Sequence, residues 1–190
     1  MANTPDFLQD AAQTLTEQGF VTSNVWYHGT SSALLESIKQ QGLVGSGDKA
    51  MKAATKQTMA TIGNEYSESK EPVFLTPSKE LAYYWAEQTV RSRGVRLGSD
   101  DQPVVLEANL PDELASQVKP DVGAASLLLV PEGEAYMAFL AEIYERNGLG
   151  TPNIDLMKAD RLEYLSVMGM AYSQKNIDAK YLSEVISGAV

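Results

Sequence analysis

The sequence contains no cysteine and only one histidine, and each scarcity excludes a kind of site. Without cysteine, the chain forms neither disulfides nor metal sites that use thiolate ligands. One imidazole is too few for a zinc site built from histidines. We therefore expect no metal cofactor, and any chemistry that requires an imidazole must use His28.

Long apolar runs are also missing, as is a signal peptide. No apolar stretch approaches the ~20 residues that cross a bilayer. The first residues, MANTPDFLQD, lack the basic and then apolar pattern of a secretory leader. We expect a soluble protein with no membrane partner, located in the cytoplasm or delivered into the cytoplasm of a target cell.

Lysine and arginine are scarce relative to acidic residues, at 15 against 25, which gives a formal net charge of −10. Tight non-specific binding to nucleic acid depends on neutralising phosphates with these cations, so the composition argues against it. Two short basic stretches, MKAATK (51–56) and RSRGVR (91–96), depart from this pattern. We interpret both as solvated surface.

The 190 residues include 44% apolar side chains, enough to bury the core of one domain. Alternating or β-forming runs predict strands at 25–28, 72–76, 103–110 and 126–130. We interpret residues 161–168 and 169–174 as two further strands or as one bent strand.

Apolar residues at helical spacing predict helices over 6–18, from Ser31 or Ser32 to Gly42, from Pro77 through Trp85, and over 133–146. We interpret 44–71 as a long excursion with room for one helix, 91–102 as a loop, and 177–186 as short helical or extended. The element order predicts an α+β fold around a mixed sheet. We expect one domain over 1–190, with 1–22 as an N-terminal helical extension.

Three separated segments carry a family resemblance when they are taken together and in order. They are WYHGTSSALLESIKQQGL (26–43), VFLTPSKELAYYWA (73–86), and RLEYLSVM (161–168) followed by IDAKYLSEV (177–185). They resemble the ADP-ribosyltransferase superfamily, in the branch that carries a His-Tyr-Glu triad, as in poly(ADP-ribose) polymerases and diphtheria-type toxins. The resemblance implies a split mixed β-sheet core with flanking helices, and NAD as a substrate.

The first segment is similar to the Trp-His-Gly-Ser start of the polymerases. The resemblance implies that His28 binds the adenosine-side ribose of NAD and that the Gly29 backbone holds the nicotinamide carboxamide. Thr30 would add a hydroxyl contact, and the amides of 29–32, including that of Ser31, or a lysine from 49–56, would hold the pyrophosphate. Alternatively, His28 ends a strand and binds a backbone partner.

The second segment is similar to a strand, a turn and a Ser-Lys helix that delivers a tyrosine onto the nicotinamide. The Ser-Lys spacing assigns this role to Tyr83, whereas counting from Phe74 assigns it to Tyr84. Ser78 begins the helix and is included among the NAD-binding residues. Neighbouring helical residues point about 100° apart, so we expect one tyrosine of the pair to belong to the core.

The third segment supplies the catalytic glutamate in this interpretation. In the polymerases the catalytic glutamate begins a strand, and a Lys-Tyr-Leu sequence follows it. Here Glu163 resembles that glutamate and residues 180–182 are Lys-Tyr-Leu, although the gap between the two is longer than in the polymerases. The alternative is one helix over 154–168 that leaves Glu163 on the surface. As the catalytic group, Glu163 would accept a hydrogen bond from the ribose 2′-hydroxyl, next to an oxocarbenium-like centre.

The expected reaction transfers one ADP-ribose from NAD to a macromolecule and releases nicotinamide. A protein is the expected target, and RNA bound through RSRGVR is the alternative. The rival functions are NAD hydrolysis and a degenerate domain that binds NAD or a partner without turnover. RNA 2′-phosphotransferases share the His-Gly-Thr start but rely on several arginines, and only five occur here. A toxin, a phage-borne effector and a housekeeping regulator all fit this activity.

Overall fold

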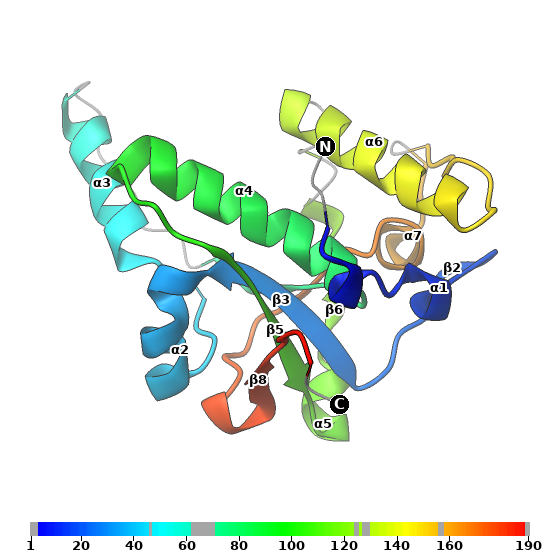
Figure 1. Ribbon diagram of the computed structural model, residues 1–190, viewed down its shortest axis with the longest axis horizontal. Coiled ribbons are helices and arrows are strands. Elements are labelled where there is room, and N and C mark those ends of the chain that lie inside the picture. Colours follow the sequence, from blue (N-terminus) through cyan, green and yellow to red (C-terminus); the bar gives the residue numbers. More distant parts are fainter. Residues whose placement is uncertain are drawn as a thin grey trace.

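The computed structural model describes residues 4–45, 47–61, 71–123, 126, 130–155 and 158–188, which form an α+β fold (Figure 1). In chain order the elements are η1 Asp6–Leu8, α1 Ala11–Thr14, β1 Leu15–Thr16, β2 Gly19–Phe20, β3 Val25–Ser31, η2 Ser32–Leu34, α2 Leu35–Gln41, α3 Lys49–Thr61, β4 Val73–Leu75, α4 Lys79–Leu97, β5 Pro103–Asn109, α5 Asp112–Ala115, β6 Lys119–Pro120, α6 Pro131–Arg146, α7 Arg161–Ser166, β7 Ala171–Ser173, η4 Ala179–Tyr181 and β8 Leu182–Glu184. Within these ranges no helix is both long and apolar enough to span a membrane.

The strands form three small sheets: the β1–β2 hairpin, a sheet in the order β3-β5-β8, and a sheet in the order β4-β7-β6. All of these described pairings are antiparallel, so the expected mixed sheet is wrong while the α+β class is confirmed. The two three-stranded sheets meet where Tyr27 and Thr76 exchange two backbone hydrogen bonds of 2.8 and 3.0 Å. From that point β3 and β4 separate.

Helix α4 lies directly on β3 and β5, with α3 at one end and α6 at the other (Figure 1). The close approach depends on Gly29. A Cβ at this position would lie 1.9 Å from the carbonyl oxygen of Ala82 and 2.6 Å from the amide nitrogen of Ala86. Only glycine therefore lets the helix backbone rest on the strand backbone.

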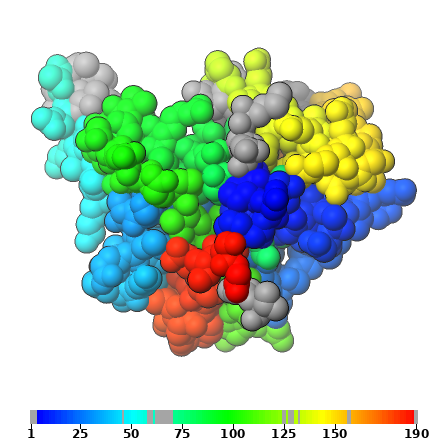
Figure 2. Space-filling view, in the orientation of Figure 1, coloured from blue at the N-terminus to red at the C-terminus, as the bar shows by residue number. Residues whose placement is uncertain are grey.

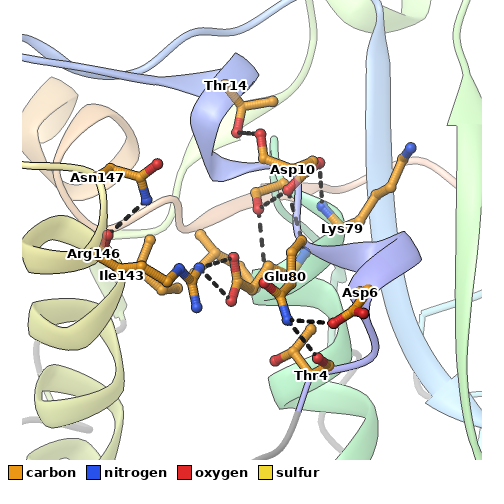
Figure 3. Close-up of polar contacts among 12 residues, drawn as sticks. Thr4, Asp6, Asp10, Thr14, Lys79, Glu80, Ile143, Arg146 and Asn147 are labelled. Atoms are coloured by element: carbon orange, nitrogen blue, oxygen red, sulfur yellow. Dashed lines mark hydrogen bonds and ion pairs between the residues drawn. The ribbon is translucent and has the colours of Figure 1, made fainter.

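The N-terminal segment caps α4 through Asp10, which is buried. Its carboxylate accepts a hydrogen bond of 2.6 Å from the Ser78 hydroxyl and one of 2.8 Å from the Lys79 backbone amide (Figure 3). An acidic side chain at a helix N-terminus satisfies free N–H groups and complements the helix dipole. In Figure 2 this segment, in dark blue, sits between α6 in yellow and the C-terminal residues in red.

An ion pair ties α6 to the first turn of α4. Arg146 donates to both carboxylate oxygens of Glu80 at 2.7 Å, and Glu80 is fully buried (Figure 3). Burial raises the pKa of Glu80, and the hydrogen bonds from Arg146 oppose that shift. Nearby, α6 packs Tyr136, Leu140 and Ile143 into a core shared with α4 and β2.

The N-terminal residues and the end of α4 differ from expectation. The helix predicted over 6–18 is wrong, because that stretch forms a 3-10 turn, one short helix and a hairpin. Gly19, with φ of +102°, makes the tight turn of the hairpin, and its backbone lies against that of Ser166. The loop predicted from residue 91 is also wrong, because α4 continues to Leu97 and ends at Gly98 in the left-handed conformation.

The segment around Glu163 is a helix rather than the expected strand. Asp160 caps α7 by accepting from the Leu162 amide at 2.9 Å, and Glu163 accepts from the Asp160 amide at 2.6 Å. This reciprocal capping box favours a helix start over an extended chain.

Other predicted elements are confirmed, namely the helix that Ser31 caps and that ends before Gly42, the helix over 133–146, and the strands near 25–28, 72–76, 103–110 and 169–174. The strand predicted at 126–130 falls largely outside the described residues.

The contact at Gly29 predicts that Gly29→Ala destabilises the protein by about 3 kcal/mol or more, because the added methyl group meets rigid helix backbone. The free energy of unfolding in urea measures this. Gly94→Ala, within α4, is the control, since its Cβ would meet nothing closer than 3.4 Å. That control should be neutral or stabilise by about 0.5–1 kcal/mol. A Gly29→Ala variant as stable as wild type would contradict the seating of α4 on β3.

Candidate functional site

A cavity of about 510 Å³ opens where β3 and β4 separate. Residues 28–30 of β3 line it, together with α2, residues 42–44, 47 and 48, α3, residues 71–74 and the C-terminal half of α4. This volume lies in the range of small-molecule and cofactor sites.

His28 lies at the junction of the two sheets and lines the cavity. Its Nδ1 is 2.8 Å from the carbonyl oxygen of Phe74 on β4. A carbonyl only accepts, so Nδ1 carries the proton and Nε2 keeps a lone pair. Burial lowers the pKa of His28, and the hydrogen bond to Phe74 partly opposes the shift. The imidazole is therefore neutral at pH 7 and can accept a hydrogen bond from a ligand hydroxyl.

The residues after His28 on β3 have different surroundings. Gly29 and Thr30 line the cavity, and Thr30 is almost completely buried. Ser31 does not line it. The Ser31 hydroxyl donates to Asp101 at 2.9 Å and accepts from the Ala33 amide, capping the helical turn η2. Of the three residues that follow His28, Gly29 and Thr30 thus line the cavity and Ser31 does not.

Two cations line the cavity, Lys52 on α3 and Arg96 on α4. Arg93, also on α4, does not line the cavity; it is buried and makes ion pairs with Asp48 and Asp101. Hydrogen bonds from the Arg93 guanidinium lower the pKa of the Asp101 carboxyl. The interpretation of both basic stretches as solvated surface is wrong for Arg93, which is buried and links the start of α3 to α4. Lys56, Arg91 and Arg96 are exposed, and Lys52 is half-buried.

Neither Tyr83 nor Tyr84 lines this cavity. Tyr84 belongs to the core, where it stacks on Phe139 with ring centroids 4.7 Å apart, so the expectation that one tyrosine packs inside is confirmed. Tyr83 lines a second cavity, of about 350 Å³, together with Phe7 and Val185. Burial, together with Glu87, raises the pKa of Tyr83.

Phe74 on β4 is also among the residues that line the His28 cavity. Along β4 its neighbours Val73 and Leu75 are each 4% exposed, whereas Phe74 is 48% exposed. Alternation along the strand turns the Phe74 ring away from the core, while its carbonyl oxygen holds His28.

The remaining predicted residues lie elsewhere. Glu163 caps α7, and Ser78 is buried against Asp10 at the start of α4; neither lines the cavity. The carboxylates that line it are Asp48, which Arg93 pairs, and Glu71. The structure brings together His28, Gly29 and Thr30, and it does not bring Ser31, Ser78, Tyr83, Tyr84 or Glu163 to them.

Sequence reasoning missed two cavity residues, Phe74 and Arg96, and it included Lys52 only as one lysine of the range 49–56. The alternation of the β4 strand carried a signal for Phe74, since the ring lies between two buried residues. Both cations belong to stretches whose charge was noticed, but their position depends on how α3 packs on α4.

No group of three or more histidine, cysteine or acidic side chains in the described ranges is placed to hold a metal ion. The chain matches no protein-family model, no curated protein and no solved structure.

Because His28 is the only histidine, its protonation can be followed without assignment. We expect the Cε1–H resonance in a proton NMR titration to have a midpoint below 6.5, because burial disfavours the imidazolium. The urea-unfolded chain should titrate near 6.5. The unfolded state then binds the proton more readily, so this group lowers stability as the pH falls through 6.5 toward the folded pKa. A folded midpoint at or above 6.5 would contradict the neutral state of the half-buried imidazole.

Proposed function

We propose that this protein is an NAD-dependent ADP-ribosyltransferase that binds NAD in the His28 cavity. The observation that carries the proposal is the neutral imidazole at the junction of two diverging sheets, inside a cavity of nucleotide size. The divergence of β3 and β4 beside His28 supports a split-sheet core of the ADP-ribosyltransferase type. The ordered resemblance of the three sequence segments is the second support.

In this proposal, His28 Nε2 accepts a hydrogen bond from a ribose hydroxyl, and the Thr30 hydroxyl adds a contact. The α4 side of Gly29 is filled by Ala82 and Ala86, so NAD can approach the Gly29 backbone only from the cavity. Nicotinamide leaves and one ADP-ribose passes to an acceptor. A protein is the proposed acceptor and RNA the alternative.

The reaction needs a carboxylate near the ribose, because positive charge develops on the sugar as nicotinamide departs. Glu163 is the candidate that the sequence resemblance supplies. Glu71 is the second candidate, because it lines the His28 cavity. Substituting each one separately distinguishes between them.

The second candidate function is NAD binding without turnover. It is favoured by one observation: Tyr83 and Glu163, two members of the expected triad, do not line the cavity that holds the third. In that case the site would bind NAD or a related nucleotide, and nicotinamide would not be released.

Calorimetry of NAD binding and an assay of nicotinamide release, with and without cell lysate, test the proposal. We expect His28→Ala to weaken NAD binding about tenfold, since it removes a buried hydrogen bond to the ligand. Release should require lysate and be lost in His28→Ala and in one of Glu71→Gln and Glu163→Gln. Glu145→Gln, on the exposed side of α6, is the control and should behave as wild type.

The other outcomes separate the rivals. Release without lysate would identify NAD hydrolysis. Binding without release in any lysate would identify the binding-only function. If wild type does not bind NAD at all, the proposed function is wrong.

A further inference from the structure

We propose that the outer edge of β8, together with the second cavity beside it, binds an extended segment of a partner protein in which a basic residue stands between two apolar residues. The segment adds a fourth strand to the sheet β3-β5-β8. The second cavity and the His28 cavity share no lining residue, and this interaction does not depend on the proposed function.

β8 is the outer strand of its sheet, and one of its edges carries unpaired backbone groups. Val185 donates its backbone N–H to the carbonyl oxygen of Val105 at 2.9 Å, so Ser183 and Val185 direct their backbone groups toward β5. Glu184, between them, directs its N–H and C=O to the opposite side. Among the described residues neither group has a hydrogen-bond partner. A donor and an acceptor at a strand edge are a template for another extended chain.

The second cavity lies beside this edge. Its volume is about 350 Å³, and Glu184 and Val185 line it together with Phe7 and Tyr83. Phe7 is 43% exposed although it is apolar. Val185 and Tyr83 pack against the same small core cluster, so the Val185 side chain lies on the face of the sheet that α4 covers. Figure 2 shows the C-terminal residues, in red, at the surface next to the dark-blue N-terminal segment.

Strand alternation determines which side chains of an added strand reach the cavity. The residue directly opposite Glu184 shares its face of the sheet, so its side chain lies beside the Glu184 carboxylate. The residues before and after it lie on the other face, which is the face of Val185. Apolar side chains at those two positions are removed from water at the second cavity, while a lysine or arginine between them pairs with Glu184.

The charge of Glu184 favours a basic segment over a second copy of this chain. Glu184 is exposed and makes no ion pair within the described residues. Two copies of β8 paired about Glu184 would place two carboxylates directly opposite each other, which destabilises a strand pair, whereas a cation at that position stabilises it. The net charge of −10 also favours encounter with a cationic segment.

A titration of the peptide acetyl-Val-Thr-Val-Lys-Val-Thr-Val-amide into ¹⁵N-labelled protein tests the proposal. We expect saturable amide shifts in β8 and in the residues that line the second cavity, with slower hydrogen exchange of the Glu184 amide. The same peptide methylated on the lysine backbone nitrogen should bind about tenfold more weakly, because it cannot donate to the Glu184 carbonyl oxygen.

An exchange of charges tests the pairing with Glu184. Glu184→Lys should weaken the lysine peptide by about three- to tenfold and strengthen a peptide with glutamate at the central position by a similar factor. Glu113→Lys, which changes an exposed carboxylate on α5, is the control and should bind both peptides within about twofold of wild type. Thermal melts should show that both variants are folded.

Absence of binding, or shifts outside β8 and the second cavity, would overturn the proposal. Equal affinity for the methylated and unmethylated peptides would do the same, since binding would then not use the strand edge. Sedimentation as a dimer that protects the Glu184 amide without peptide would assign the edge to a second copy and also overturn the proposal. NAD is absent from every one of these measurements, so the proposed function stands or fails separately.

Discussion

The close contact between Gly29 and α4 is the constraint on which the rest of the structure depends. Because the helix backbone lies within van der Waals distance of the strand, neither element can shift without a clash or a void. The Asp10 carboxylate fixes the first turn of the helix, and the Arg146–Glu80 pair joins α6 to that turn. Contacts with Gly29, Asp10 and Arg146 therefore fix α4 against β3, the N-terminal segment and α6.

The rotation of α4 on β3 decides what reaches the candidate site. With Ala82 and Ala86 facing Gly29, Tyr84 points into the core and Tyr83 points into the second cavity. About two and a half turns after Tyr84 the same helix places Arg93 beside Asp48, and Arg96 follows almost one turn later at the His28 cavity. The lining of the His28 cavity thus takes Arg96 from α4, Lys52 from α3 and Phe74 from β4.

Sequence reasoning succeeded where the signal was local. Alternation located β5, and a capping serine with a glycine of φ +75° at Gly42 bounded the helical stretch after β3. It failed where distant partners decide. The burial of Arg93 depends on Asp48, 45 residues away. The α7 helix was missed although its signal was local: the capping box of Asp160 and Glu163 begins a helix within a run of β-forming residues. Of the residues predicted for the site, His28, Gly29 and Thr30 line one cavity, while Tyr83 and Glu163 do not line it.

The most direct test is to map, by amide chemical shifts in a ¹H–¹⁵N NMR spectrum, where NAD binds on the folded chain. The account predicts that shifts concentrate on β3 from His28 to Thr30, on β4 around Phe74, and near Lys52 and Arg96, all of which line one cavity. Shifts concentrated instead around Tyr83 and Val185, at the second cavity, or an unchanged spectrum at saturating NAD, would contradict it.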